Sequence, residues 1–311
     1  MSFKIVFCLT TNGSDAFFRM HSLAVRSVQY YMPKAQIITL VDLESANKIT
    51  KSGIASCGRP LGMRVIETAS GPDGFRNRWM KTKLRELVSG DVLYLDSDLV
   101  LRAGIQELWA YQGDLMGVLD RNQTSPYFAP FDRDRYKAAG WPLPSHGSIN
   151  GGVLFWRDSK AAHNLSAAYH SRWLESYQRT GKAMDQQALN TAIDDCNVEL
   201  MILPSTYNSM ERYHPSDIEE AKIWHFIFSN VRLSGDHKSW TKWESIVRGE
   251  SAEPHPMEWS RWRHPWIVRD PLAWMFMHAL KRSAKVNYIQ DFRRIWLLGD
   301  RVSSLKSLLR K

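Results

Sequence analysis

The sequence predicts an α/β fold built on a mixed, mainly parallel sheet flanked by helices. First, short apolar and β-branched segments alternate with longer segments of helical periodicity from residue 4 onward, as in a parallel sheet with crossover helices. Second, the residues before Asp96, Val92-Leu-Tyr-Leu95, form a nearly continuous apolar run, which indicates a strand buried on both faces. With 311 residues, 44% hydrophobic and 23% charged, the chain also has the composition of a globular protein with a large core.

The individual elements follow from apolar period, proline and glycine. A helix at residues 16–31 ends before Pro33, and further helices are expected at about residues 77–88, at 159–180 and from Asp185 onward. A polar, helix-compatible stretch separates the second and third strands. Residues 122–146, rich in proline, glycine and aromatic residues, are expected to form a long loop at the substrate site. Strands are expected at residues 4–11, 36–41, 63–68, 92–95, 115–119, 150–156, 199–203 and 222–228.

Two carboxylates interrupt the most apolar strand region. Asp96 and Asp98 follow the run Val92-Leu-Tyr-Leu95 directly. Side chains two residues apart in an extended chain point the same way, so both acids can converge on one ion. Carboxylate oxygens suit hard divalent cations. A polar strand end that caps the next helix is the competing interpretation, and for a lone Asp-x-Asp pair it would be preferred.

Cysteine content and the N-terminus place limits on the compartment. Three widely spaced cysteines (Cys8, Cys57 and Cys196) without a Cys-x-x-Cys pair argue for reduced thiols and against a disulfide scaffold or a structural zinc site. The first residues do not resemble a signal peptide, and no apolar stretch is long enough to span a bilayer. A cytoplasmic location is therefore expected. No dinucleotide or NTPase phosphate-loop motif is present.

Most of the net charge of +9 lies in a C-terminal tail. Residues 255–311 contain 12 Lys and Arg against 4 Asp and Glu, interleaved with five tryptophans. We therefore divide the chain into a catalytic domain, residues 1–250, and a basic, Trp-rich helical extension, residues 251–311. Such a helix suits an anionic membrane surface, here the inner face of the membrane. Packing of the tail on the domain is the alternative. Nucleic acid is not expected as a partner, because the rest of the chain is nearly neutral.

The order of motifs resembles nucleotide-sugar glycosyltransferases of the GT-A fold, most closely the family-8 type that includes lipopolysaccharide galactosyl- and glucosyltransferases and glycogenin-like enzymes. The resemblance covers residues 4 to about 240. Each motif is weak alone, but the set in this order is fairly specific. The matching motifs are Thr10-Thr11-Asn12, Val92-Leu-Tyr-Leu-Asp-Ser-Asp98, Asn150-Gly-Gly-Val153, Asp185-Gln186 with Leu189-Asn190, Leu203-Pro204 with Tyr207-Asn208, and Trp224-His225-Phe226.

The resemblance implies a metal site and a donor site. Asp96, Asp98 and His225 match the residues that bind manganese (or magnesium), which holds the diphosphate of a nucleoside-diphosphate sugar. For His225 the competing interpretation is a core histidine satisfied by one hydrogen bond. The positions that match donor contacts are Thr10, Thr11, Asn12, Ser97, Asn150, Gly151 and either Arg78 or Lys81, whose register is open. Lys238 matches the family's diphosphate lysine only loosely, because the family's Lys-Pro-Trp motif is missing.

Three further positions face the sugar in the family. Asp185 is expected to bind sugar hydroxyls, Gln186 to lie near the anomeric carbon, and Asp120 to line the sugar and acceptor pocket. Helix capping is an alternative or additional role for Asp185, and a simple β-turn is the alternative for Asn150. Among the other basic residues of the preceding helix, Lys83 and Arg85 are expected on a solvated face.

The resulting hypothesis is a metal-dependent transferase that moves a hexose from a nucleotide sugar, most simply a UDP-sugar, to a glycan or lipid-linked saccharide, with retention of configuration. An inverting enzyme would need a general base, for which Asp120 is the candidate. Two rivals are a sugar-1-phosphate nucleotidyltransferase and a non-catalytic carbohydrate- or membrane-binding protein on the same fold. The first would normally carry a Gly-rich basic loop after the first strand, where the chain has Thr10-Thr-Asn-Gly13.

Overall fold

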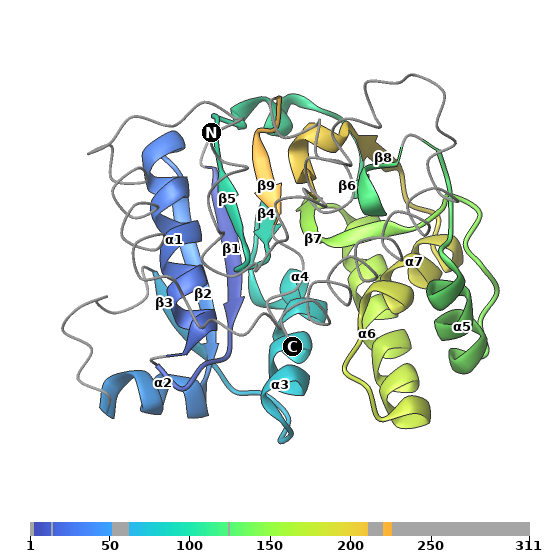
Figure 1. The fold of residues 1–311 in the computed structure, drawn as a ribbon, viewed down its shortest axis with the longest axis horizontal. Coiled ribbons are helices and arrows are strands. Elements are labelled where there is room, and N and C mark those ends of the chain that lie inside the picture. Colours follow the sequence, from blue (N-terminus) through green and yellow to red (C-terminus); the bar gives the residue numbers. More distant parts are fainter. Residues whose placement is uncertain (1–2, 14, 52–61, 124, 211–219, 226–311) are drawn as a thin grey trace, which may run out of the picture.

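A computed structural model describes residues 3–13, 15–51, 62–123, 125–210 and 220–225. Within them a seven-stranded sheet runs in the order β3-β2-β1-β4-β7-β6-β8 (Figure 1). The first four strands are parallel, β7 is antiparallel to β4 and β6, and β8 is parallel to β6. The predicted mixed, mainly parallel sheet is confirmed. The strands are β1 Lys4–Leu9, β2 Gln36–Asp42, β3 Met63–Ile66, β4 Val92–Leu95, β6 Leu115–Leu119, β7 Ile149–Trp156 and β8 Leu200–Leu203.

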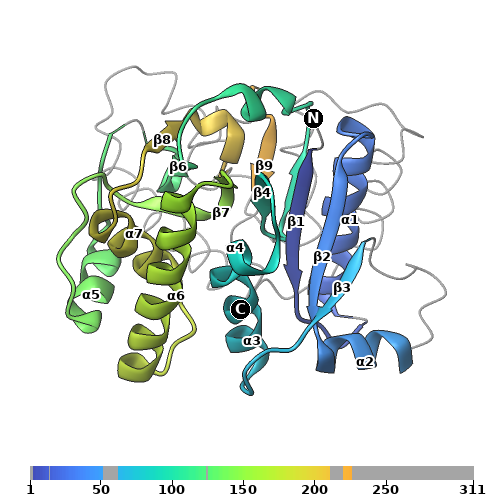
Figure 2. The same ribbon diagram turned by 180° about the vertical axis from the view of Figure 1, so that it is seen from behind.

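The central strands are buried on both faces, and the alternation of their side chains divides the core in two. On β1 and β4, Val6 and Tyr94 face one cluster, while Ile5 and Leu93 face the other. The first cluster packs under α3, α4, α5, α6 and α7, and the second under α1 (Figures 1 and 2). The helices are α1 Ala16–Tyr31, α2 Leu43–Lys51, α3 Asp73–Thr82, α4 Leu84–Leu87, α5 Pro130–Ala139, α6 Lys160–Thr180 and α7 Gln186–Asp195, with short 3-10 turns η1 Gln106–Ala110, η2 Asp120–Asn122 and η3 Ser205–Asn208.

A small second sheet brings distant parts of the chain together. β5 (Leu99–Leu101) pairs antiparallel with β9 (Ile223–His225), and Leu99 lies opposite His225. The backbone N–H of His225 also donates to Ser209 O at 2.9 Å, which ties β9 to the segment after η3. The strand that carries His225 is thus held beside the residues that follow β4.

Two expectations about secondary structure were wrong. The segment 122–146 is not a continuous loop, because α5 lies within it. Pro130 stands in the first turn of this helix, and Gly140, with φ +73°, ends it in the left-handed conformation. The helix expected at 77–88 begins at Asp73, directly after Pro72, and is interrupted at Lys83.

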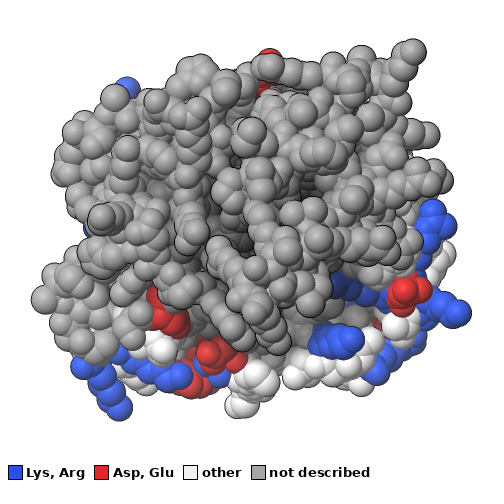
Figure 3. Space-filling model, viewed as in Figure 1, with Lys and Arg blue, Asp and Glu red and all other residues white. Residues whose placement is uncertain are grey.

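The face seen in Figure 3 shows Lys and Arg mixed with Asp and Glu over its described part. Along its lower edge, where Figure 1 places α2, α3, α5 and α6, side chains of both signs lie next to one another. None of the described helices is long and apolar enough to cross a membrane. The tail and its tryptophans lie outside the described residues, so its predicted structure and the division at residue 250 stay predictions.

Candidate functional site

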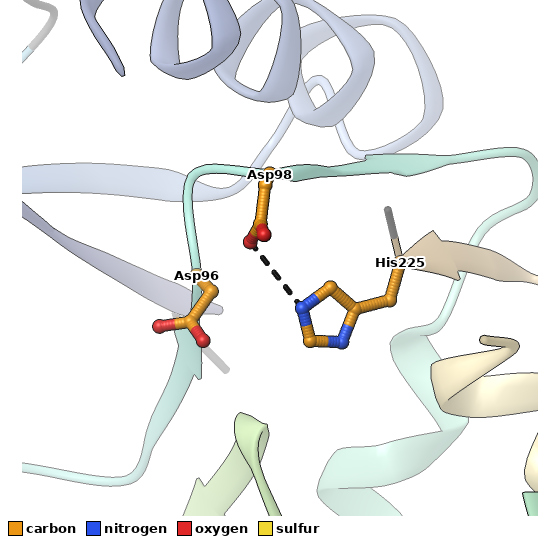
Figure 4. Close-up of side chains that lie close together, drawn as sticks. All are labelled: Asp96, Asp98 and His225. Atoms are coloured by element: carbon orange, nitrogen blue, oxygen red, sulfur yellow. Dashed lines mark ion pairs between the residues drawn. The ribbon is translucent and has the colours of Figure 1, made fainter. Parts of the chain in front are cut away.

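The carboxylates of Asp96 and Asp98 and the imidazole of His225 form one cluster at the carboxyl end of β4. One ligand atom from each of the three lies within 4.8 Å of the others, and His225 Nε2 is 3.3 Å from Asp98 Oδ1. Figure 4 shows both carboxylates on the Nε2 side of the ring. Opposite ligands of an octahedral ion with bonds of about 2.1 Å are about 4.2 Å apart. The three ligand atoms therefore need to approach one another only slightly to bind one ion.

The chemistry of the three groups fits a divalent transition metal. Two carboxylates with one imidazole suit manganese better than calcium. Asp96 Oδ1 accepts from Tyr94 Oη at 2.5 Å and lies 3.4 Å from Lys81 Nζ, which orients the carboxylate. Burial alone would raise the pKa of Asp96, but Lys81 and Arg78 hold it below its usual range. Asp96 is therefore ionised at neutral pH, as a metal ligand must be.

Burial and charge act in opposite directions on His225. Burial alone would lower the pKa of its imidazole, but the carboxylates of Asp98 and Asp96 raise it above the ordinary value. His225 is thus electrostatically coupled to both carboxylates. A histidine held against two carboxylates is not the simple core histidine considered as the alternative.

Gly152 of β7 lies against this cluster. Its carbonyl accepts from Asp96 N at 2.8 Å, and a Cβ at this position would be 2.3 Å from His225 Cε1 and 3.0 Å from Asp96 Oδ2. The second glycine of Asn150-Gly-Gly-Val153 therefore leaves room for the side chains of His225 and Asp96.

A second, cationic cluster surrounds Asp185. Arg78 Nε lies 2.8 Å from Asp185 Oδ1, and Lys81 Nζ lies 2.9 Å from Asp185 Oδ2. Tyr169 Oη donates to Oδ2 at 2.7 Å. Burial alone would raise the pKa of Asp185, but Lys81 and Arg78 hold it far below its usual range. Arg78 and Lys81 both reach the same carboxylate, and which of them contacts the donor stays a prediction.

Asp185 does not cap α7. It precedes the helix, but its side chain makes no capping hydrogen bond and its φ and ψ, −111° and −24°, are already helical. The capping role was wrong because the cations of Lys81 and Arg78 hold the carboxylate instead. Lys81 also lies 3.2 Å from where a Cβ of Gly151 would stand, so Gly151 lets β7 approach this cluster.

The sugar-facing residues predicted from the family resemblance also come together. Asn150 Nδ2 donates to Asp120 Oδ1 at 2.9 Å, and Gln186 Oε1 lies 3.5 Å from the same nitrogen and 3.4 Å from Gly151 N. Asn150 is part of β7, so a simple β-turn is the wrong interpretation. Asp120 also lies 3.4 Å from Arg121 Nη2, so both carboxylate oxygens are engaged.

The loop after β1 is organised by Asp15, a residue that the sequence did not single out. Its carboxylate accepts from Thr11 Oγ1 and Asn12 N, each at 2.8 Å, and caps α1 by accepting from Phe18 N at 2.9 Å. Asp15 therefore shapes the Thr10–Asn12 loop. The helix-capping pattern, an Asp directly before an apolar helix, was the available signal.

Ser97, between the two acids, has its Oγ 3.5 Å from His21 Nδ1. Lys238 lies outside the described residues.

Arg85 is not on a solvated face, because its side chain is fully buried against Asp158, with 2.6 Å between Nη2 and Oδ1. The expectation was wrong because it assumed one continuous helix across Lys83, where the helix is interrupted. Lys83 itself is half-buried, paired with Glu86 at 2.8 Å.

The sequence of this chain matches the model for glycosyl transferase family 8 over residues 83–244, just over half of the chain. No curated protein matches in sequence. Among solved structures, the galactosyltransferase LgtC, in complex with donor and acceptor sugar analogues, is similar at 15% identity and a TM-score of 0.50, over 82% of this chain and 98% of LgtC.

Two further structures show the same fold. The bifunctional glycosyltransferase WbbM is 14% identical with a TM-score of 0.53, over 83% of this chain and 51% of WbbM. GlyE of Streptococcus pneumoniae TIGR4 is 17% identical with a TM-score of 0.51, over 80% of this chain and 62% of GlyE. The fold is thus that of a GT-A glycosyltransferase. The chain belongs to glycosyl transferase family 8, and the nucleotidyltransferase and non-catalytic alternatives are set aside.

Proposed function

We propose that this glycosyltransferase transfers a hexose from a nucleoside-diphosphate sugar, UDP-hexose in the simplest case, to a glycan or lipid-linked saccharide, with a divalent metal and with retention of configuration. The observation that supports it is the cluster of Asp96, Asp98 and His225 beside the cationic cluster of Arg78 and Lys81. Together they offer one cation site and fixed positive charge at the carboxyl edge of the sheet.

The protein groups have distinct tasks in this proposal. Asp96, Asp98 and His225 would hold manganese or magnesium, which as a Lewis acid stabilises charge on a diphosphate leaving group. Arg78 and Lys81 keep Asp185 ionised and fixed in place, ready to accept hydrogen bonds from sugar hydroxyls. The carboxamide of Gln186, beside Gly151, faces the reacting part of the donor.

Retention is favoured by the partners of Asp120. A general base for an inverting reaction must be able to accept a proton from the acceptor hydroxyl. Asp120 already accepts from Asn150 and lies against Arg121, an arrangement that suits binding better than proton abstraction. In the retaining reaction a phosphate oxygen of the donor takes the acceptor proton, so Asp120 serves to orient sugar hydroxyls.

The test is hydrolysis of UDP-hexoses with and without manganese. Wild-type protein should cleave a donor only when the metal is present, and Asp98→Asn should lose this activity while staying folded. The matched control is Asp195→Asn, at the last residue of α7, where an exposed acid pairs with Arg172 away from the site. Cleavage by Asp98→Asn at the wild-type rate would refute the metal-dependent proposal.

We further propose, from the sequence of residues 251–311, that the tail associates with an anionic membrane on its cytoplasmic face. Its tryptophans and basic residues are the support. A chain truncated before Trp259 should no longer sediment with anionic vesicles, whereas the full chain should. Equal sedimentation of both would remove this proposal.

A further inference from the structure

A continuous path of side-chain hydrogen bonds joins His225 to Asp120. His225 Nδ1 lies 2.8 Å from Asn208 Oδ1, Asn208 Nδ2 is 3.0 Å from Asn150 Oδ1, and Asn150 Nδ2 is 2.9 Å from Asp120 Oδ1. Both asparagines are buried, Asn208 completely. The path therefore connects the metal cluster with the acid on the sugar side through groups shielded from water.

One backbone N–H fixes the direction of every bond in this path. The N–H of Gly152 points at Asn150 Oδ1, 2.9 Å away. A backbone N–H can only donate, so the atom that it contacts is the amide oxygen of Asn150. The other end of the same amide is then the NH2 group, which donates to the carboxylate of Asp120.

The same logic passes through Asn208 to the histidine. Asn150 Oδ1 is an acceptor, so Asn208 must present its NH2 group to it, and its oxygen then faces His225 Nδ1. That oxygen cannot donate, so His225 Nδ1 must carry a hydrogen whether the ring is neutral or charged. Nε2 is consequently the nitrogen that loses its proton, and it is the nitrogen beside Asp98.

We propose that Asn208 is a positioning residue, which fixes the imidazole of His225 as the Nδ1–H tautomer and links its orientation to that of Asn150 and Asp120. The proposal rests on the metal site in the proposed function, and it concerns a residue whose side chain has no direct part in that site. Its place at the end of η3 supports this, because Tyr207 anchors the turn by donating to Glu107 at 2.7 Å.

Two substitutions separate the hydrogen bond of Asn208 to His225 from its hydrogen bond to Asn150. Asn208→Leu keeps the branched shape of the side chain, with bulkier methyl ends, and removes both the acceptor for His225 and the donor for Asn150. Asn208→Asp keeps the acceptor but, when ionised, cannot donate to Asn150. The control is Ser209→Ala, at a neighbouring buried residue whose hydroxyl has no hydrogen-bond partner among the described residues.

The first measurement is nitrogen NMR of the His225 ring at a pH where the imidazole is neutral, assigned with His225→Gln. Wild type, Asn208→Asp and Ser209→Ala should show hydrogen on Nδ1, whereas Asn208→Leu should show a mixture of tautomers. The second is manganese affinity by calorimetry, which should fall by about 10–100-fold in Asn208→Leu and stay unchanged in Ser209→Ala.

Hydrogen on Nε2 in wild type overturns the inference without any variant, even if Asn208→Leu does not fold. A folded Asn208→Leu with wild-type manganese affinity and a single Nδ1–H tautomer also overturns it, since a merely structural role would lower stability alone. If wild type binds no manganese, the proposed function fails instead, and the NMR measurement still decides the role of Asn208.

Discussion

Replacement of Gly152 by alanine tests how closely β7 packs against His225 and Asp96, two of the proposed metal ligands. The backbone of Gly152 does not require glycine, since its φ is not among the positive values of the chain, so the effect of a methyl group is steric. The added carbon would stand 2.3 Å from His225 Cε1, against an ordinary contact of at least 3.4 Å. The imidazole must therefore move by about 1 Å or β7 must move away from β4.

Either movement has a predictable cost. Overpacking of a well-packed interior costs about 1–3 kcal/mol of unfolding free energy, and a displacement of about 1 Å at a reacting centre costs up to about 100-fold in rate. We expect Gly152→Ala to lose roughly 10–100-fold in manganese affinity and a similar factor in donor cleavage. Urea unfolding, calorimetry with manganese and UDP-hexose cleavage measure the three effects.

The control is Gly74→Ala in α3, where the added carbon meets only Ala183 Cβ at 3.9 Å. This variant should keep manganese affinity and gain up to about 1 kcal/mol, since alanine is the better helix former. If Gly152→Ala binds manganese like wild type and is as stable, the close approach of β7 to His225 is refuted.

Two further predictions concern the electrostatic clusters. The folded state holds the pKa of Asp185 below its usual range, so the contribution of this carboxylate to stability is present above about pH 4 and is lost as the pH falls below that value. Lys81→Met should lose roughly 3 kcal/mol of unfolding free energy at neutral pH, and its stability should fall less steeply in acid than that of wild type. Urea unfolding curves with the same dependence on acid pH in both proteins would contradict this. Asp15→Ala removes the cap of α1 and the anchor of Thr11 and Asn12, so it should cost about 0.5–2 kcal/mol and raise the KM for the donor with little change in kcat; an unchanged KM would show that this loop does not contact the donor.

The strands and most helices follow from local pattern, because burial on two faces leaves a continuous apolar run and proline or glycine marks the ends. The helix α1, Ala16–Tyr31, was predicted to the residue. The helix α5 was missed because five of its 10 residues are charged and leave no clear apolar stripe, and only two of its residues besides Asp132 are well buried, Tyr136 and Ala139.

Local sequence patterns predicted the arrangement of the candidate site less well than they predicted the secondary structure. The resemblance to family 8 predicted that Asp96, Asp98 and His225 form one site. In the structure, the pairing of Leu99 with His225 across the small sheet places the three residues together. That pairing joins residues more than a hundred positions apart, and no periodicity in either segment specifies it. Asp185 shows the same limit, since its position before a helix favours capping, while its partners Arg78 and Lys81 come from another element.

The role proposed for Asn208 could not be predicted from the sequence. Its identity in the Tyr207-Asn208 motif was visible, but its chemistry depends on the direction of hydrogen bonds that only the packed structure defines. The Gly152 N–H, a backbone group, determines that direction. Side-chain motifs alone cannot reveal such a constraint, because each asparagine can present either end of its amide.

The central claim is that Asp96, Asp98 and His225 hold the ion that binds the donor diphosphate. Electron paramagnetic resonance of manganese bound to the protein with UDP measures this directly, through hyperfine coupling to nearby nuclei. We predict coupling to a histidine nitrogen and to phosphorus on the same ion, with the nitrogen coupling lost in His225→Gln. Manganese that binds without nitrogen coupling, or with coupling that persists in His225→Gln, would contradict the site described for this glycosyltransferase.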